Sequence, residues 1–114
     1  MTTNKEIWYQ NERLVKQYFE KLWYTTLEQN FTIRGGEIDL LLRKGGKIKI
    51  VEVKTVNYLS DFSKYITPNK IHYLQRTWDQ YLYKSALDYD EVSIDVVFVK
   101  SGEIVEHYEN VTNN

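Results

Sequence analysis

The sequence predicts an α/β or α+β domain in which a mixed sheet of about five strands is flanked by two main helices. Two stretches, near residues 5–23 and 68–85, repeat their apolar residues at helical spacing. Five other stretches are typical of strands, and Gly-containing or polar turns separate several of them. The order along the chain is one helix, three strands, one helix and two strands.

Each predicted helix has an apolar face. The first, residues 5–23, carries Lys and Glu on much of the opposite side. The second begins at Thr67-Pro68, with Thr as N-cap and Pro as the first helical residue, and it runs to about Ser85. The residues expected on the apolar faces are Ile7, Leu14, Val15, Tyr18, Phe19 and Leu22 in the first helix and Ile71, Leu74, Trp78, Tyr81 and Leu82 in the second.

The five strands are expected at 25–33, on either side of Gly45-Gly46 within 35–54, at 92–100 and at 103–108. The first strand is irregular at Gln29-Asn30. A polar loop containing several aromatic residues follows the third strand and runs to about residue 66. Residues 92–100 are apolar enough to form a central, buried strand.

The central hairpin brings acidic residues together. Gly45-Gly46 tolerates the positive φ angles of a two-residue turn, and counting outward from it places Asp39 opposite Glu52 and Glu37 opposite Lys54. Strand alternation puts all four on one face. Like charges across a sheet are destabilising, so the two acids indicate a divalent cation such as Mg²⁺, which prefers oxygen ligands. The alternative is a cross-strand Glu37–Lys54 ion pair beside a solvated Asp39.

Glu12 joins this group if the first helix packs on the sheet. It borders the apolar stripe of that helix, where a glutamate is ordinarily a snorkelling or salt-bridged residue. The functional interpretation is that the helix aims Glu12 at Asp39 and Glu52. Two carboxylates and a backbone carbonyl would hold Mg²⁺, and Lys54 would position a water or neutralise charge on a phosphate. Phosphodiester hydrolysis needs these groups.

Composition restricts the other function classes. The 114 residues predict one domain, residues 1–114. The chain has no cysteine, which excludes disulfides and thiolate metal sites, and His72 and His107 lack metal-ligand spacing. No stretch is long enough to span a membrane, so we expect no membrane partner and a cytoplasmic location.

Charge is unevenly distributed, although the net charge is only −1. Residues 34–76 contain nine basic and four acidic residues, whereas the rest of the chain contains six basic and twelve acidic ones. This asymmetry predicts either a basic footprint for a polyanion or lysines that keep a hairpin edge soluble. Charge alone favours the second interpretation.

The hairpin resembles the active-site hairpin of the PD-(D/E)xK nuclease superfamily, with Asp39 as the aspartate and Glu52-Val53-Lys54 as the E-x-K. Nearly the whole chain also resembles the YraN family of small bacterial proteins, which are predicted endonucleases distantly similar to archaeal Holliday-junction resolvases. The matching residues are Glu12, Asn30-Phe31, residues 34–40, residues 51–55, Thr67-Pro68 with Lys70, Asp95-Val96-Val97 and Glu106-His107. The chain departs from the family at Asn11, Val56 and Ile71, where glycine, arginine and glutamine are usual.

This resemblance implies a restriction-endonuclease-like fold and a Mg²⁺- or Mn²⁺-dependent endonuclease acting on DNA in preference to RNA, with branched or structured DNA as the expected form. The expected site residues are Asp39, Glu52 and Glu12 for the metal (Glu12 as a further ligand or a water-mediated helper), Lys54 for catalysis, and Arg34, Lys44, Lys47 and Lys70 for phosphate contacts. A homodimer is expected by analogy with resolvases, which cut two strands. Two alternatives stay open: a catalytically inactive nucleic-acid-binding or adaptor protein, and an RNA-directed nuclease.

Overall fold

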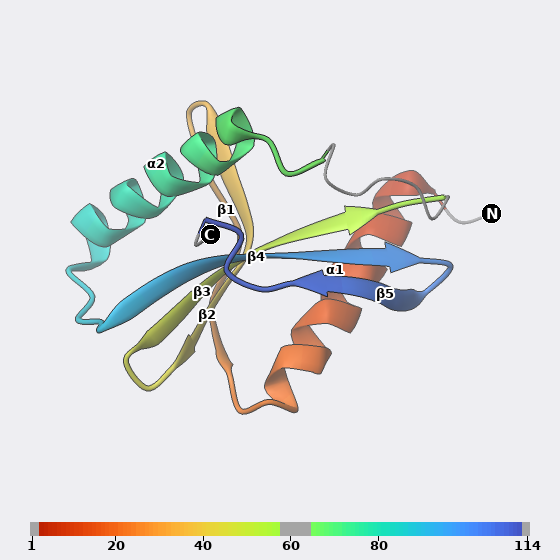
Figure 1. Ribbon diagram of the computed structural model, residues 1–114, viewed down its shortest axis with the longest axis horizontal. Coiled ribbons are helices and arrows are strands. Elements are labelled where there is room, and N and C mark those ends of the chain that lie inside the picture. Colours follow the sequence, from red (N-terminus) through yellow and green to blue (C-terminus); the bar gives the residue numbers. More distant parts are fainter. Residues whose placement is uncertain (1–2, 58–64, 113–114) are drawn as a thin grey trace.

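The computed structural model describes residues 3–57 and 65–112, and its elements follow the predicted order. Its five strands form one mixed sheet with two helices packed on it (Figure 1). The elements are α1 (Asn4–Glu20), β1 (Thr25–Ile33), β2 (Gly36–Lys44), β3 (Lys47–Thr55), α2 (Pro68–Ser85), β4 (Glu91–Lys100) and β5 (Glu103–Tyr108). The strands lie in the order β1-β2-β3-β4-β5, and the β3–β4 pair is parallel whereas the other three are antiparallel. The predicted fold class is confirmed.

The helix boundaries follow from their caps. Thr3 caps α1 by accepting a hydrogen bond from the backbone N of Glu6, 3.1 Å away. This helix ends at Glu20, three residues before the predicted end, because the chain turns back at Trp23, which has a φ of 72°. Thr67 caps α2 as predicted, with Pro68 as its first residue. Part of the predicted loop before α2, residues 58–64, lies outside the described residues.

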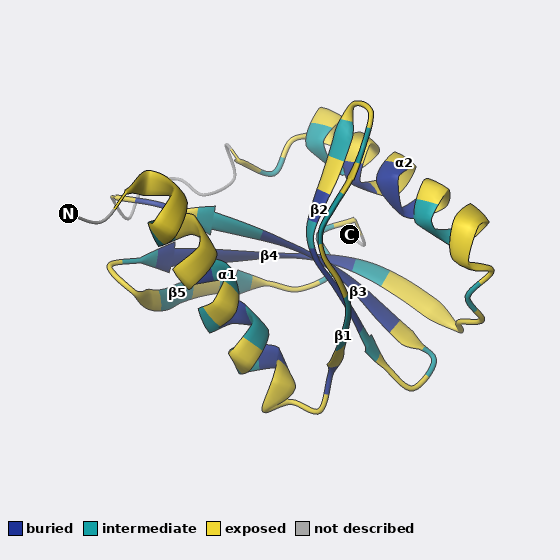
Figure 2. Ribbon diagram, turned by 180° about the vertical axis from the view of Figure 1, so that it is seen from behind, coloured by how far each residue is buried: buried dark blue, intermediate teal, exposed yellow. Residues whose placement is uncertain are grey.

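The two helices cover opposite faces of the sheet, because successive side chains of a strand point in opposite directions. On β3, Val51 belongs to the cluster beneath α1, whereas Ile48 and Ile50 belong to the cluster beneath α2. Figure 2 views the molecule from behind and shows α1 in front of the sheet. The main buried residues are Val15, Phe19, Leu40, Leu42, Val51, Val97 and Val99 under α1, and Leu41, Ile48, Ile50, Leu74, Trp78 and Ile94 under α2.

The strands β2 and β3 part halfway along their length. Their register runs from Lys44 opposite Lys47 to Leu40 opposite Val51, as counting from the Gly45-Gly46 turn predicts. Beyond Leu40, β2 remains paired with β1, and β3 remains paired with β4 as far as Thr55. Figure 1 shows the two arms diverging, with the β1–β2 end beside α2. We call this region the fork.

The β1–β2 arm is held against α2 by a close approach at Gly36. A Cβ atom added there would lie 2.1 Å from Oγ1 of Thr77, a buried residue whose hydroxyl donates to the carbonyl oxygen of Tyr73 at 2.7 Å. Glycine therefore permits a spacing between strand and helix that alanine does not. In the described parts of the chain, neither helix is long and apolar enough to cross a membrane.

Candidate active site

A cavity of about 670 Å³ lies at the fork. Side chains from α1, β2, β3 and the first turn of α2 line it. Besides Val53, Thr55 and Asn30, the lining residues are the acids Glu12, Glu37, Asp39 and Glu52, the lysines Lys5, Lys54 and Lys70, and the aromatic residues Trp8, Tyr9 and Tyr65. The structure thus brings the four residues predicted for catalysis and metal binding to one cavity.

Asp39 and Glu52 form the centre of this cavity. They were predicted to lie opposite each other in the β2–β3 ladder, but that ladder ends one pair earlier, at Leu40 and Val51. The Asp39 carboxylate instead accepts a hydrogen bond from the backbone N of Val53 at 2.8 Å. The two carboxyl groups are also hydrogen-bonded to each other. Burial, followed by this bond and the charge of Glu52, raises the pKa of Asp39 to about 9.

Lys70 contacts the same acid pair. Its Nζ lies 3.0 Å from Oε2 of Glu52, whose side chain is 7% exposed. That buried oxygen makes no aligned hydrogen bond to the described part of the chain, so the ammonium neutralises it as an ion pair. Lys70 was predicted to contact a phosphate, and in this structure its partner is a carboxylate.

Glu12 reaches the cavity from α1, which covers the face of the sheet opposite to α2 and Lys70. Asn30 holds it by donating from Nδ2 to both carboxylate oxygens, at 3.1 Å each. Asn30 has a φ of 49°, a conformation that asparagine tolerates well, and it lies where irregularity was predicted. The register of β1 against β2 shifts earlier, between Thr26 and Glu28. Burial, and then the nearby charges of Glu37 and Glu52, raises the pKa of Glu12, although the Asn30 bond opposes the rise.

Asn11 secures the position of α1 on the sheet. It is buried, and its Nδ2 donates to Oγ1 of Thr55 at 2.7 Å. Thr55 directly follows Lys54 on β3, so this bond fixes the helix beside the candidate catalytic lysine. Asn11, which stands where the family usually has glycine, therefore forms a contact between helix and sheet next to Glu12.

Lys54 is half-buried and makes no ion pair with any residue in the ranges 3–57 and 65–112. The alternative of a Glu37–Lys54 cross-strand ion pair is wrong, because the two strands have already parted and Glu37 pairs with Thr32 of β1. Lys54 therefore presents its ammonium to the cavity without a carboxylate partner among the described side chains.

The other basic residues predicted to contact phosphates lie elsewhere. Arg34 lies exposed in the β1–β2 turn, and Lys44 and Lys47 flank the β2–β3 turn, at the end of these strands away from the fork. Lys47 pairs with Glu91 at 3.6 Å, and the Lys44 Nζ lies 5.6 Å from the ring centroid of Tyr24. None of the three lines the cavity. The sequence prediction omitted Lys5 and Trp8, although Trp8 lies one helical turn before Glu12 and shares its face.

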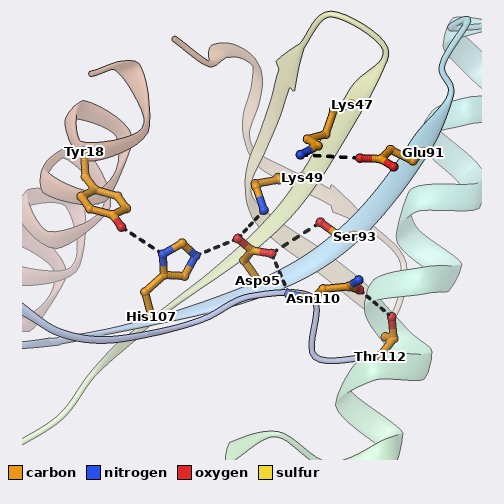
Figure 3. Close-up of polar contacts among 9 residues, drawn as sticks. All are labelled: Tyr18, Lys47, Lys49, Glu91, Ser93, Asp95, His107, Asn110 and Thr112. Atoms are coloured by element: carbon orange, nitrogen blue, oxygen red, sulfur yellow. Dashed lines mark hydrogen bonds and ion pairs between the residues drawn. The ribbon is translucent and has the colours of Figure 1, made fainter. Parts of the chain in front are cut away.

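A second polar cluster is centred on Asp95 of β4, which is fully buried (Figure 3). Its Oδ2 accepts from Lys49 Nζ at 2.8 Å and from His107 Nε2 at 2.7 Å, and Oδ1 accepts from the backbone N of Asn110 at 3.1 Å. The other ring nitrogen of His107 lies 3.1 Å from the hydroxyl of Tyr18 in α1. Although burial alone would raise the pKa of Asp95, the bonds from His107 and Lys49 outweigh it and lower the pKa.

Asp95, His107 and Glu109 also place three potential metal ligands within 4.8 Å of one another. In the described residues this is the one such group of three, so Glu12, Asp39 and Glu52 do not form an equally compact set. Because the ammonium of Lys49 already bonds to Asp95, we interpret the Asp95 cluster as a structural network joining α1 to β4 and β5.

Fold and site together define an α/β protein whose sheet opens into a cavity lined by acidic, basic and aromatic residues. The model of the "Uncharacterised protein family UPF0102" matches residues 11–99, and the chain belongs to this family, the YraN family. The predicted family resemblance is confirmed.

Similar curated proteins cover most of the chain. The UPF0102 protein of Syntrophomonas wolfei is 37% identical over 98 residues, which cover 84% of this chain and 85% of that protein. The UPF0102 protein of Flavobacterium johnsoniae is 32% identical over 116 residues, or 94% of each chain. That of Thermotoga maritima is 31% identical over 104 residues, or 91% of this chain and 94% of the relative.

Proposed function

We propose that this protein is a Mg²⁺- or Mn²⁺-dependent endonuclease that hydrolyses phosphodiester bonds of DNA. The observation that carries the proposal is the pair formed by half-buried Asp39 and buried Glu52, which lines the same cavity as Lys54. A carboxylate pair of this kind is costly unless a positive charge compensates for it. The resemblance of the hairpin to PD-(D/E)xK nucleases gives the chemistry that such a pair performs.

The donor set fits a hard divalent cation. Asp39 and Glu52 supply oxygen ligands, and the Lys70 ammonium lies 3.0 Å from Glu52. A metal ion would add a positive charge between the two acids. A bound Mg²⁺ or Mn²⁺ would supply Lewis-acid stabilisation of the phosphate and acidify water at the site.

The protein's own residues would divide the remaining work. Asp39 and Glu52 would hold the ion at the scissile phosphate. Lys54 would donate to a phosphate oxygen as negative charge builds up on it in the transition state. Glu12, fixed by Asn30, would accept a hydrogen bond from the attacking water. Hydrolysis forms one bond from water oxygen to phosphorus and breaks one P–O ester bond, whose leaving oxygen gains a proton.

A cleavage screen tests this proposal. The substrates are duplex, four-way-junction and single-stranded DNA and single-stranded RNA, each with Mg²⁺ and with Mn²⁺. We expect DNA to be cut by the wild type, and Asp39→Asn and Glu52→Gln to reduce cleavage below detection. The matched control is Asp79→Asn, the same chemical change at an exposed position of α2. Cleavage that survives both site substitutions would refute the proposal, and cutting of RNA alone would favour an RNA-directed nuclease.

A second candidate function is a catalytically inactive nucleic-acid-binding or adaptor protein. The observation that favours it is the Lys70–Glu52 ion pair, because a built-in ammonium beside Glu52 makes a metal unnecessary. Titration with Mg²⁺ separates the two candidates. An enzyme should show a rise in melting temperature and shifted resonances of Asp39 and Glu52 at millimolar Mg²⁺. If the wild type shows neither while Lys70→Met shows both, Lys70 occupies the cation position and the inactive candidate is supported.

A further inference from the structure

Two aromatic side chains are exposed on the wall of the cavity. Trp8 is 59% exposed and Tyr9 is 52% exposed, and both line the cavity together with Tyr65. They lie in the first half of α1, one turn before Glu12 and outside the apolar clusters that attach this helix to the sheet. Their rings therefore contribute little to the core, and exposing them to water carries a cost that packing does not explain.

Ammonium groups line the same cavity as these rings, together with the four acids described above. The Nζ of Lys5 lies 5.9 Å from the ring centroid of Tyr9, and Lys5 and Lys54 line the same cavity. Neither lysine has an ion-pair partner among the residues that the structure describes. Aromatic rings and ammonium groups that share one cavity are a combination that binds a single nucleic-acid strand, because the rings stack on bases and the cations contact phosphates.

We propose that Trp8 and Tyr9 form a stacking platform for unpaired bases, so that the substrate of this cavity is DNA with a single-stranded segment at the scissile phosphate. The inference rests on the proposed function for its choice of DNA. The faces of paired bases are covered by their neighbours in a duplex, so only an unstacked nucleotide can lie flat against these rings. Lys5 contacts the phosphate of the stacked nucleotide, and Lys54 contacts the adjoining phosphate beside Asp39 and Glu52.

The test is equilibrium binding in EDTA, which separates binding from cleavage. The probes are a fluorescein-labelled oligothymidylate of about 15 nucleotides, matching the usual site sizes of such proteins, and an abasic strand with the same number of phosphates. Trp8→Ala and Tyr9→Ala are compared with Trp23→Ala and Tyr83→Ala. The control residues are 81% and 88% exposed and do not line the cavity, so the same kinds of ring are removed from elsewhere on the surface.

We expect the wild type to bind oligothymidylate at least about tenfold more tightly than the abasic strand. Trp8→Ala and Tyr9→Ala should each weaken oligothymidylate binding by roughly 5- to 100-fold and leave abasic binding unchanged, since one stacked base has a contribution of that size. Trp8→Phe, which keeps a ring, should recover most of the affinity. The two control substitutions should change neither probe.

Three results would overturn the inference: equal binding of the two probes, unchanged binding by the cavity variants, or tighter binding of oligouridylate RNA than of oligothymidylate. A further contrary result is a dimer that Trp8→Ala converts to a monomer while binding stays the same, because the rings would then form a protein interface. Cleavage without base-dependent binding would leave the nuclease proposal standing and refute this one. Base-dependent binding without cleavage of any substrate would support the stacking platform and refute the nuclease proposal.

Discussion

At the scale of single residues, the surroundings of Asp39 act on its pKa in opposite directions. Burial and the neighbouring Glu52 favour the protonated acid, whereas the backbone N–H of Val53 favours the carboxylate. The first two effects are larger, and the pKa rises to about 9. Asp39 in the unfolded chain has a pKa near 3.8. Between pH 3.8 and pH 9 the folded protein binds more protons at Asp39 than the unfolded chain does. The contribution of Asp39 to the stability of the fold is therefore fully present below pH 3.8 and is lost as the pH rises toward 9.

The first prediction concerns this dependence in the metal-free protein. Asp39→Asn removes the titrating group and the repulsion, so at pH 8 we expect its melting temperature to exceed that of the wild type by roughly 4 °C or more, corresponding to about 1 kcal/mol. The difference should shrink as the pH falls to 5. Thermal melts in EDTA across this range measure it, with Asp79→Asn as the control. A large loss of stability in Asp39→Asn would instead assign Asp39 a structural role.

The second prediction concerns Lys54, whose ammonium faces the cavity without a carboxylate partner among the described residues. Lys54→Met keeps the length of the side chain and removes its charge. On the substrate that the wild type cuts, we expect a loss of roughly 10²- to 10³-fold in kcat, the size typical of removing one donor to a transition-state oxygen. Single-turnover cleavage measures it. The exposed Lys84 of α2 provides the matched control, Lys84→Met, which should retain wild-type activity.

The third prediction concerns Asp95. Asp95→Ala leaves the buried ammonium of Lys49 without its counter-charge, so we expect a loss of about 3–5 kcal/mol in the free energy of unfolding, measured with urea. The double variant Lys49→Met/Asp95→Leu removes both charges and should recover much of that loss. If the double variant is as unstable as the single one, the cost arises from packing or from His107 rather than from the buried charge.

At the scale of elements, the pairing of two strands could be predicted from the sequence only where the turn between them sets the register for their whole paired length. Gly45-Gly46 does so for β2 and β3, and the predicted pairing holds as far as Leu40 opposite Val51. Counting from the Ser101-Gly102 turn would place His107 opposite Val96 and therefore on the face away from Asp95. A bulge between Phe98 and Val99 shifts β5 by one residue and sets His107 opposite Val97 instead.

The bulge explains why the Asp95–His107 contact was not predicted. Nothing in the local sequence marks the extra residue, and a shift of one position transfers every later side chain to the other face of the sheet. The fork escaped prediction for a related reason: alternation places Asp39 and Glu52 on one face but does not reveal where a ladder stops. The caps of both helices, by contrast, depend on one or two neighbouring residues, and Thr67-Pro68 was sufficient to locate the start of α2.

The fourth prediction belongs to the packing of α2 against β2. Gly36→Ala inserts a methyl group against the side chain of Thr77, and we expect a loss of about 1–3 kcal/mol in the free energy of unfolding. Thr77→Ala removes the obstructing hydroxyl, so the double variant should be less unstable than the sum of the two single ones. Urea denaturation of the four proteins measures this coupling. Strict additivity would mean that the close approach at Gly36 does not limit the packing.

At the scale of the whole molecule, the basic residues of the stretch 34–76 do not gather on one surface. Lys54 and Lys70 line the cavity at the fork, where Lys5 of α1 joins them, whereas Lys44 and Lys47 lie at the far end of the central hairpin. The sequence indicated how many basic residues the middle of the chain has. It could not indicate which of them share a surface, because that depends on the direction in which each strand runs from the fork.

The fifth prediction follows from this division. A single strand held in the cavity meets Lys5 and Lys54, which make no ion pair with any described residue, so the logarithm of the binding constant should fall with the logarithm of salt concentration with a shallow slope of about −1 to −2. Binding of oligothymidylate at several NaCl concentrations measures it. A slope steeper than about −4 would require contacts outside the cavity. Lys44→Gln/Lys47→Gln would then show whether the hairpin turn supplies them.

The acid pair also has a place in the mechanics of the fork. The β1–β2 arm contacts α2 at Gly36 and α1 through the Asn30–Glu12 bond, while the β3–β4 arm contacts α1 through Asn11 and Thr55 and α2 through the Glu52–Lys70 ion pair. Asp39 bridges the opening by bonding to Val53 and Glu52 on the opposite arm. Under the proposed function, exchange of its proton for a metal ion would alter this link between the two arms, and the width of the cavity would then depend on the ion that it holds.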